Sequence, residues 1–480
     1  MGSDTDHAVI IGGSLAGLCS ARVLADFYDK VTIYERDELP DGPEQRSAVP
    51  QGRHVHLLMS RGAQEFDNLF PGLLDDMVDA GVPKVEDRPD FIHFGAAGHV
   101  LHVSRTLDEP FAAYIPSRPF LEWQIRRRAT APANVELVRA AVNEPVFEGG
   151  RVTGVHLDTG ETVTADLVID ATGRGTRLPV WLEKWGYRRP DEVTVDVGIG
   201  YATLRVKIPD GLQEKIVVAG ASREQPVGLG MLFYEDGIWT LTTFGVAKVD
   251  APKNFDEMCA LADKILPGHI AAAIRSGQPV GEVAIHKYPT SRWRRYDKLD
   301  RFPDGILPVG DSVVSFNPTY GQGMTMTSLQ ARELQRLLAE RDGDLSANFR
   351  RAVAKNTFPV WHMNAIGDHI LHGASGKRPP WYRPVGNLFD QFLGAAETEP
   401  VLGEWFLRRF SLLDSLWMVP SPRLVARTVR FNASAWLADR SRSANAGDRR
   451  ASRQPPPAPS RSGTGSTSAQ SDSASARDTQ

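Results

Sequence analysis

The sequence predicts a mixed α/β protein, and three observations along the chain support this prediction. An apolar strand, a glycine turn and a helix follow one another over residues 7–24. Residues 193–244 are rich in β-branched and aromatic side chains with partial alternation, which is typical of strands. Apolar residues recur at helical spacing over 329–338, and residues 349–370 and 405–431 are again apolar with basic interruptions. We therefore expect an N-terminal α/β domain, a separate sheet and a helical C-terminal region.

Length and charge narrow the class of protein. The chain has 480 residues, of which 41% are hydrophobic, and this exceeds what a single core normally supports. Lys and Arg number 55 against 59 Asp and Glu, so the formal net charge is -4. The basic excess that drives binding to a phosphate backbone is absent, and nucleic acid is not an expected partner.

The number of cysteines and the N-terminal segment indicate in which cellular compartment the protein is found. The two cysteines, Cys19 and Cys259, are too few for a disulfide framework and too far apart for a structural zinc site. The first seven residues are polar and acidic and lead directly into a strand, without the basic start and apolar middle of a signal peptide. No uninterrupted apolar run approaches the roughly 18 residues of a membrane span. We expect a cytoplasmic protein.

The N-terminal glycine turn has the features of a dinucleotide-binding fingerprint. Gly12, Gly13 and Gly17 lie between the first strand and the first helix, where backbone N–H groups and the helix dipole can bind a pyrophosphate. The second strand ends in Glu35, near the ~20-residue offset at which a carboxylate binds an adenosine ribose. Ser14 replaces the middle glycine. The fingerprint predicts a Rossmann-like domain but does not distinguish FAD from NAD.

A second glycine motif lies about three hundred residues further on. Residues 305–311 form a strand that ends in Gly310-Asp311, and residues 317–324 read Asn-Pro-Thr-Tyr-Gly-Gln-Gly-Met before a predicted helix. Together with the fingerprint, this arrangement resembles the group A flavoprotein monooxygenases, the para-hydroxybenzoate hydroxylase family. The resemblance implies that Asp311 holds the ribityl chain of FAD and that the 317–324 loop faces the flavin pyrimidine. A helix N-terminus there stabilises the negative charge of the reduced flavin.

Two arginines and a third turn extend the resemblance. Arg118, just before a predicted helix, matches the flavin-contacting arginine of the family, and Arg53 lies in a loop that approaches the cofactor in its members. A guanidinium donates in a fork and stays charged, which suits a pyrophosphate. A surface position in solvent is a stronger alternative for Arg53 than for Arg118, and Gln124 is a weaker candidate. In the third turn, Thr172-Gly173 replaces the family's Asp-Gly pair, so the nicotinamide contact credited to that aspartate is left unassigned.

The resemblance also suggests a reaction. Residues 51–58, Gln-Gly-Arg-His-Val-His-Leu-Leu, and residues 170–175 are similar to actinobacterial flavin epoxidases of the polyether type, which are related to squalene epoxidase. Such enzymes are expected to reduce FAD with NADH or NADPH, to form a C4a-hydroperoxide with dioxygen and to transfer one oxygen atom to an apolar small molecule. This implies alkene epoxidation. Aromatic hydroxylation of a phenol is the first alternative, and no catalytic residue is assigned.

A phenol hydroxylase benefits from a base near the substrate hydroxyl, whereas an alkene needs none. His286, Tyr288 and Tyr234 lie in the strand-rich middle and are candidates, although packed sheet residues are the more common interpretation. His54 and His56 would share a strand face, but no third ligand is near them, so no metal site is predicted.

Other functions use the same cofactor frame. A flavin halogenase would carry a Trp-x-Trp-x-Ile-Pro stretch, which the strand around Trp239 does not match. An alkene reductase resembling geranylgeranyl reductase would use the flavin without dioxygen. From another class, the chain could be a non-catalytic flavin-binding protein or a membrane-surface protein docked through residues 405–417, although a core-facing helix is the more common origin of that pattern. A separate flavin reductase is a possible partner, because no second nucleotide-binding unit is recognisable.

We thus predict an FAD/NAD(P)-binding Rossmann-like domain of the para-hydroxybenzoate hydroxylase type, with a mixed β-sheet substrate domain and a helical C-terminal region. The predicted ranges are 1–85, 110–185 and 295–345 for a discontinuous FAD-binding domain, 86–109 and 186–294 for the substrate domain, 346–440 for the helical region and 441–480 for a disordered tail. The predicted cofactor-binding residues are Gly12, Gly13, Ser14, Gly17, Glu35, Arg36, Arg53, Arg118, Val142, Asp311, Pro318, Gly321, Gly323 and Met324.

Overall fold

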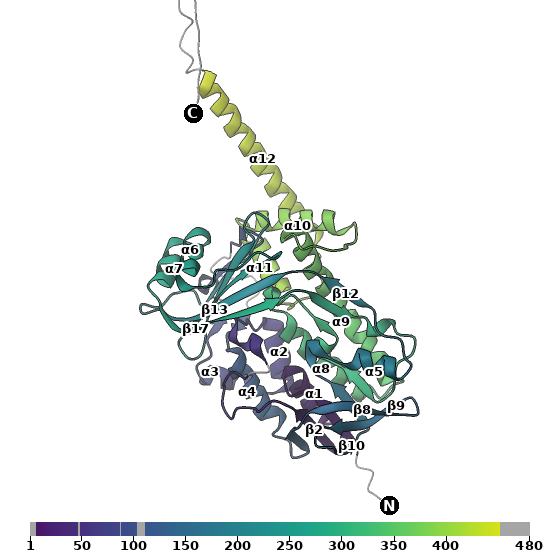
Figure 1. Cartoon of the computed structure of the whole chain (residues 1–480). Coiled ribbons are helices and arrows are strands. Elements are labelled where there is room, and N and C mark those ends of the chain that lie inside the picture. Colours follow the sequence, from purple (N-terminus) through teal and green to yellow (C-terminus); the bar gives the residue numbers. More distant parts are fainter. Residues whose placement is uncertain (1–5, 47–48, 87, 103–110, 452–480) are drawn as a thin grey trace, which may run out of the picture. The chain divides into compact units, whose positions relative to one another are not determined.

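The computed structural model describes residues 6–46, 49–86, 88–102 and 111–451. Contacts between Cα atoms divide these residues into two units, one that ends at Thr428 and one that begins at Val429. Among the described residues, the first unit contains the sheets and the helices up to α11, and the second consists of the greater part of α12 (Figure 1).

A five-stranded parallel sheet with the strand order β19-β11-β1-β2-β7 organises the first unit. Its strands are β1 (His7–Ile11), β2 (Lys30–Glu35), β7 (Val135–Arg139), β11 (Leu167–Asp170) and β19 (Ile306–Pro308). Both faces of such a sheet are covered, which is why its strands are almost continuously apolar. Parallel strands end at the same edge, so the turns after β1, β11 and β19 come together there. These are the three turns that the sequence singled out, and this edge is where open α/β sheets bind ligands.

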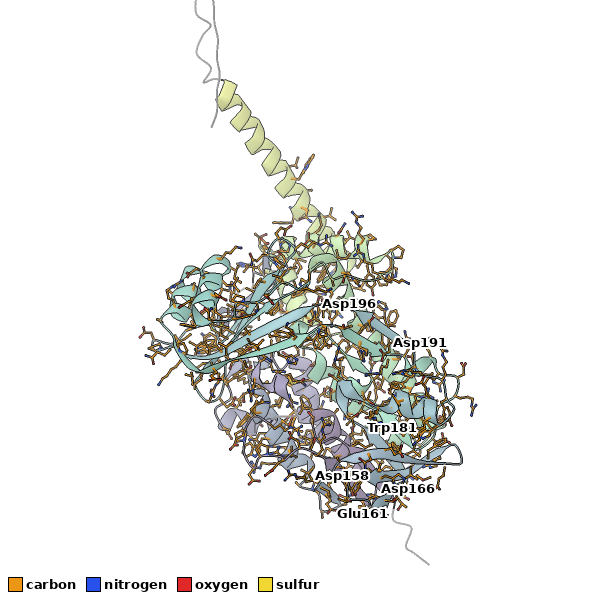
Figure 2. All side chains as sticks on the ribbon, in the orientation of Figure 1. Asp158, Glu161, Asp166, Trp181, Asp191 and Asp196 are labelled. Atoms are coloured by element: carbon orange, nitrogen blue, oxygen red, sulfur yellow. The ribbon has the colours of Figure 1, made fainter. Side chains whose placement is uncertain are left out.

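Among the described residues, six helices belong to the same part of the fold as this sheet. They are α1 (Leu15–Leu24), α2 (Ser60–Leu69), α3 (Leu73–Asp79), α4 (Arg118–Ala129), α5 (Leu178–Lys184) and α8 (Gly323–Glu340). Helix α1 packs against α4 and α8, and α2 packs against α8. Trp181, labelled in Figure 2, is buried and anchors α5 to the same hydrophobic core. The side chain of Ser117 caps α4 by accepting a hydrogen bond from the N–H of Phe120.

A mixed seven-stranded sheet, in the order β17-β13-β16-β15-β14-β4-β5, forms a second layer. Its strands are β4 (Ile92–Ala96), β5 (His99–Val100), β13 (Ile199–Lys207), β14 (Ile216–Ala219), β15 (Val227–Phe233), β16 (Trp239–Gly245) and β17 (Gln278–Tyr288). Helices α6 (Phe255–Ile265) and α7 (Gly268–Arg275) contribute apolar side chains to a core that also contains Ala202, Leu204 and Val206 of β13. Strand side chains alternate, so Tyr201 belongs instead to the main core beside the parallel sheet. The second sheet thus presents one face to α6 and α7 and the other to the main core beside the parallel sheet.

Three small sheets complete the strands described. They contain β8 (Val142–Glu148), β9 (Arg151–Leu157) and β10 (Thr162–Thr164), then β12 (Glu192–Val195), β18 (Ser291–Arg294) and β20 (Val314–Ser315), and finally β3 (Lys84–Glu86) and β6 (Ala112–Tyr114). Short 3-10 helices are η1 (Pro50–Arg53), η2 (Pro89–Phe91), η3 (Gly173–Gly175), η4 (Tyr296–Lys298), η5 (Gly310–Ser312) and η6 (Pro318–Tyr320).

The C-terminal part of the described chain is helical. It comprises α9 (Leu345–Ile366), the π-helical turn η7 (Gly367–Leu371), α10 (Tyr382–Ala396), α11 (Pro400–Phe410) and α12 (Pro422–Ala451). Phe406 and Leu407 of α11 are buried, which agrees with the core-facing interpretation of the segment that begins at Trp405. No helix among the described residues is long and apolar enough to cross a membrane.

One predicted range differs from the structure, and others extend beyond the described residues. Helix α12 continues to Ala451, so residues 441–451 are helical where we expected disorder. This stretch is rich in Ala and Arg, which have high helix propensity and prolong a helix that has already begun. Residues 452–480 of the predicted tail and 103–110, at the end of the first substrate-domain segment, lie outside the described residues.

Candidate functional site

The two glycine motifs, far apart in the sequence, meet in the structure. Strand β11 lies between β1 and β19, so the turns that follow β1 and β19 lie at the same edge of the sheet. Gly310 has a φ of +61°, and a Cβ built on it would lie 2.7 Å from the Cβ of Ala16 in the first turn of α1. The predicted meeting of the two motifs is therefore observed.

The first motif requires glycine for steric reasons. Gly12 has a φ of +106°, and a Cβ on Gly12 would lie 2.7 Å from the carbonyl oxygen of Ala171. A Cβ on Gly17 would lie 1.9 Å from the carbonyl oxygen of Gly12. The N–H of Gly13 donates to Oε2 of Glu35 at 2.8 Å. The glycines thus hold the N-terminus of α1 against the sheet and place Glu35 beside the turn.

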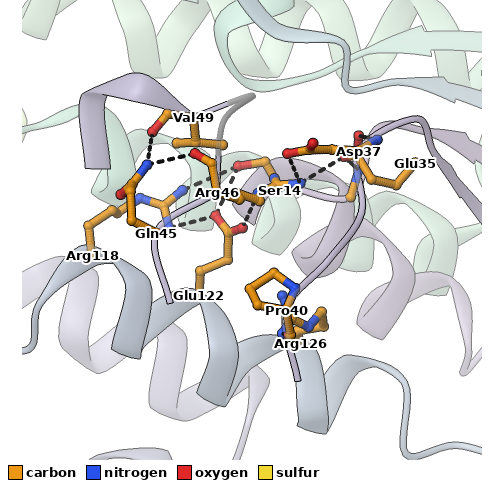
Figure 3. Close-up of polar contacts among 11 residues, drawn as sticks. Ser14, Glu35, Asp37, Pro40, Gln45, Arg46, Val49, Arg118, Glu122 and Arg126 are labelled. Carbon is orange, nitrogen blue, oxygen red and sulfur yellow. Dashed lines mark hydrogen bonds and ion pairs between the residues drawn. The ribbon is translucent and has the colours of Figure 1, made fainter. Parts of the chain in front are cut away.

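A buried arginine–carboxylate network, formed by Ser14, Glu35, Arg46, Arg118 and Glu122, surrounds this turn (Figure 3). Arg46 joins two carboxylates, with Nη1 at 3.1 Å from Oε2 of Glu35 and Nε at 2.8 Å from Oε1 of Glu122. Arg118 Nη1 lies 2.7 Å from Oε2 of Glu122, and Arg118 Nη2 donates to Oγ of Ser14 at 3.2 Å. The serine that replaces the fingerprint glycine is therefore part of the network.

The network has the chemistry to bind a pyrophosphate. Arg46 Nε and Arg118 Nη1 are buried in ion pairs with Glu122 whose angles are not those of a regular hydrogen bond. Both are donors that phosphate oxygens can use, next to the N-terminus of α1. The residues present therefore fit the diphosphate and ribose of a dinucleotide such as FAD.

Arg46 and Glu122 were not among the residues that the sequence predicted. Arg118 and Glu122 are four residues apart in a predicted helix, and this spacing places them on one face, which was a usable signal. Arg46 belongs to a loop without periodicity. The loop is held against α4 because Trp123 Nε1 donates to the carbonyl of Asp41 at 2.7 Å and Arg126 donates to the carbonyl of Pro40.

Several predicted residues lie outside this network. Arg36 and Arg53 are exposed, so the surface interpretation suits Arg53. Gln124 is buried but accepts a hydrogen bond from Arg128 at 2.7 Å. Val142 is half-buried at the start of β8, close to the backbone contact in which the N–H of Ala140 donates to the carbonyl of Glu35 at 3.1 Å.

Asp311 occupies the second turn. Its Oδ2 accepts a hydrogen bond from Oγ of Ser315 at 3.3 Å. Burial raises the pKa of Asp311, while the Ser315 hydroxyl and the positive charge of Arg174 oppose this increase. The charge of Arg118 also acts on Asp311, so the two turns share one electrostatic environment.

The loop over residues 317–323 leads into α8, which begins at Gly323, and hydrogen bonds hold the loop against the π-helical turn η7. Asn317 Nδ2 donates to Oδ1 of the buried Asp368 at 2.7 Å, and the Tyr320 hydroxyl donates to the same oxygen at 3.2 Å. A Cβ on Gly367 would lie 2.2 Å from the Tyr320 oxygen, so η7 approaches the loop closely. π-helical turns are frequent at functional sites. Within the loop, Pro318 and Gly323 are exposed, Gly321 has a φ of +69°, and Met324 is half-buried.

Aromatic and polar side chains of the second sheet, together with His54 at the end of η1, form a wall next to the site. Nδ1 of His54 lies 2.7 Å from Oγ1 of Thr203, and the ring of His54 lies 5.6 Å from the rings of both Tyr201 and His286. Burial lowers the pKa of His54 to about 4, and the charge of His286 adds to this decrease, so His54 is neutral near pH 7. The Tyr201 hydroxyl is buried without a hydrogen-bond partner among the described residues.

The two other candidate bases have structural partners. The Tyr234 hydroxyl accepts from the N–H of His56 at 2.9 Å and donates to the carbonyl of His56 at 3.1 Å, so it fixes the backbone of that loop. The Tyr288 hydroxyl lies 2.8 Å from Oγ of Ser315, which donates to Asp311. Tyr288 therefore links the wall to the second turn. Within the described residues no group of three His, Cys, Asp or Glu side chains is arranged to hold a metal ion.

Comparison with known proteins identifies the family. The chain is 62% identical to Protein Rv3254 of Mycobacterium tuberculosis over 454 residues, which cover 91% of this chain and 96% of that protein. The chain belongs to the Rv3254 family. Residues 376–443 match the Mycobacterium Rv3254 C-terminal domain.

More distant relatives indicate the wider superfamily to which the chain is similar. The chain is 26% identical to kynurenine 3-monooxygenase of Salinispora arenicola over 66% of this chain and 69% of that protein. The solved structure of p-nitrophenol 4-monooxygenase PnpA from Pseudomonas putida matches with a TM-score of 0.59 at 17% identity, over 86% of this chain and 98% of that one. These matches confirm the predicted fold class and the FAD-dependent monooxygenase superfamily. They also agree with the predicted enzyme class, an oxidoreductase.

Proposed function

We propose that this protein is an FAD-dependent monooxygenase that places one oxygen atom from dioxygen on an apolar small molecule, with alkene epoxidation as the leading reaction. The observation that carries the proposal is the close packing of Gly310 on Ala16, which joins the Asp311 turn to the N-terminus of α1. This juxtaposition supports a single extended cofactor that spans both turns.

Each part of the site has a role in holding that cofactor. The glycine turn, Arg46 and Arg118 would bind the diphosphate, and Glu35 would accept hydrogen bonds from the adenosine ribose. Asp311 would bind the ribityl chain. The loop over 317–323 and the N-terminus of α8 would face the flavin ring, where the helix dipole favours negative charge. When bound and reduced by NADH or NADPH, FAD supplies the electrons that activate dioxygen.

The side chains on the substrate side of the site would position the substrate and keep water away from it. Tyr201 and Phe244, whose rings lie 6.4 Å apart, belong to the buried wall of β13 and β16. His54 beside them is neutral near pH 7 because burial lowers its pKa to about 4. A wall of this kind favours an apolar substrate. Epoxidation of an alkene requires no base from it.

Phenol hydroxylation is the second candidate, and one observation favours it. The Tyr201 hydroxyl is buried and unpartnered among the described residues, so it can bind a hydroxyl or carbonyl oxygen of a substrate. The neutral imidazole of His54, whose ring centre lies 5.6 Å from that of Tyr201, can accept a hydrogen bond from a substrate hydroxyl.

The two candidates are separated by tracing labelled dioxygen. Purified protein loaded with FAD is supplied with NADH or NADPH, with and without a flavin reductase, and with panels of apolar alkenes and of phenols. Label in an epoxide supports the proposal, and label in a hydroxylated phenol supports the second candidate. Alkene reduction without dioxygen consumption, or failure of the protein to bind FAD, would reject both.

A further inference from the structure

An apolar patch lies on the surface of the helical region. It is formed by Phe358, Trp381, Val385, Leu388 and Trp417, all of which are exposed, Leu388 to 70% and Trp417 to 52%. The aromatic members are continuous: the ring of Phe358 lies 5.8 Å from that of Trp417 and 4.3 Å from that of His362, which in turn lies 5.5 Å from Trp381. The patch is therefore one surface and not a set of scattered residues.

The orientation of α10 keeps the patch on the outside. Trp381, Val385 and Leu388 are spaced by four and three residues, so they share one face at the start of this helix. The opposite face buries Tyr382 and Gly386. A Cβ on Gly386 would lie 2.5 Å from Cγ2 of Ile370 in η7, so α10 contacts η7 through a residue that must be small. If α10 rotated so that its apolar face turned inward, Gly386 would no longer contact Ile370.

Exposed basic side chains lie beside the patch, although the chain as a whole has a net charge of -4. Lys377, Arg378 and Arg383, just before and at the start of α10, are all exposed, whereas Asp390 further along α10 pairs with His99 at 3.3 Å. Arg423 at the start of α12 is also exposed, and Arg427 pairs with Glu399 at 3.7 Å.

Acidic side chains lie both near the patch and away from it: Asp196 forms a backbone bridge with Ser375, and Asp390 lies on α10 itself. Figure 2 labels Asp158, Glu161 and Asp166 near β8 to β10, at the opposite end of the view from α10. The apolar patch, with Lys377, Arg378 and Arg383 beside it, is thus an apolar and locally basic face of the first unit.

We propose that this face binds the surface of an anionic lipid bilayer, with the apolar patch in the headgroup region and the basic residues at the lipid phosphates. Tryptophan and leucine with neighbouring Lys and Arg are the composition of interfacial membrane-binding surfaces. A second copy of the chain is the other occupant to test, because a symmetric dimer would also bury an apolar patch of this kind. The proposal does not depend on the reaction that the enzyme catalyses.

Vesicle sedimentation of the full chain tests the proposal. We expect binding to vesicles of equimolar phosphatidylcholine and phosphatidylglycerol, and much weaker binding to phosphatidylcholine alone or at high salt. Leu388→Ser and Trp417→Ser should each weaken binding about tenfold or more, the equivalent of losing one buried large apolar side chain. Lys377→Glu, Arg378→Glu and Arg383→Glu should each weaken it about fivefold.

Val180→Ser is the matched control, because Val180 is a 45% exposed apolar residue on α5, outside the patch. It should bind vesicles like the unmodified protein. Quenching of tryptophan fluorescence in the unmodified protein by brominated phosphatidylglycerol gives a second readout that does not depend on any variant. Absence of binding by the unmodified protein, or equal loss in Val180→Ser, would overturn the proposal. So would a dimer in light scattering that Leu388→Ser dissociates without lipid, because a second copy would then cover the patch.

Discussion

Gly310 and Ala16 lie so close together that a Cβ added to the glycine would be 2.7 Å from the Cβ of the alanine. Real Cβ atoms do not approach each other to this distance, so any larger residue at position 310 must push η5 and α1 apart. The diphosphate and ribityl parts of one cofactor would have to bind across this contact. Its effect on cofactor affinity is therefore a direct measure of whether the two turns form one site.

Gly310→Ala should weaken FAD binding at least about tenfold, because the shift separates Asp311 from the N-terminus of α1. It should also lower the free energy of unfolding by more than the strain of its positive φ alone. Gly149→Ala is the control, since Gly149 has a φ of +57° and open space around it. The control should cost about 1–2 kcal/mol and leave FAD affinity unchanged. Flavin fluorescence titration and urea unfolding measure the two quantities, and equal effects of both variants would contradict the shared site.

Arg46→Met should lower both stability and FAD affinity. Arg46 joins Glu35 and Glu122, and removing it leaves Glu35 without its arginine partner and Glu122 paired with Arg118 alone. Breaking a buried pair typically costs about 3–5 kcal/mol. Arg139→Met is the control, because the ion pair of Arg139 with Glu38 is exposed and such pairs contribute about 0–1 kcal/mol. If Arg46→Met binds FAD as tightly as the unmodified protein, Arg46 has no part in the cofactor site.

Stability should fall between about pH 6.5 and pH 4 partly because of His54. Burial lowers the pKa of His54 from 6.5 to about 4, so below pH 6.5 the unfolded state binds a proton that the folded state does not. The contribution of His54 is thus fully present above pH 6.5 and is lost as the pH falls through this range, by up to about 1.4 kcal/mol per pH unit. His54→Gln should flatten this part of the profile measured by urea unfolding. His156→Gln, at an exposed position on β9, should leave the slope unchanged.

Tyr201→Phe and Tyr288→Phe should behave differently, although both remove a buried hydroxyl from the same wall. The Tyr201 hydroxyl has no partner among the described residues, so its loss should leave the free energy of unfolding unchanged or slightly higher. The Tyr288 hydroxyl lies 2.8 Å from Oγ of Ser315, and its loss should cost about 1 kcal/mol. Thermal unfolding of the two variants tests this difference. A cost for Tyr201→Phe as large as that for Tyr288→Phe would show that the Tyr201 hydroxyl has a structural partner.

The fold and the cofactor frame were predictable because their signals are local. A glycine that must accept a positive φ, such as Gly12, or approach a neighbouring backbone, such as Gly17, follows from the strand, turn and helix pattern around it. Strand periodicity likewise indicated the separate sheet. The meeting of the Gly310 turn with α1 followed from the resemblance and from the convergence of parallel strand ends at one edge.

The residues that the sequence did not reveal act through long-range contacts. Arg46 lies in an irregular loop and meets Glu122 only after α4 packs beside α1. Asp368 is 51 residues from Asn317, and nothing in the composition of η7 indicates that its carboxylate accepts hydrogen bonds from the 317–323 loop. Such pairings depend on tertiary packing, which one sequence does not specify through propensity or periodicity.

Asp368→Ala should loosen the 317–323 loop. Asp368 accepts hydrogen bonds from Asn317 Nδ2 and from the Tyr320 hydroxyl, and both donors would be left without this partner. A buried donor without a partner costs about 1–3 kcal/mol, so the local opening of the loop should become roughly tenfold more frequent. Hydrogen exchange at the amides of residues 319–323 measures this opening. Asp414→Ala is the control, because Asp414 pairs with Arg408 at the surface and does not contact the loop. The asparagine variant, Asp368→Asn, keeps an acceptor oxygen and should restore part of the protection. If exchange in Asp368→Ala equals that in the unmodified protein, η7 does not hold the loop, and the order of the loop must come from residues 317–323 themselves.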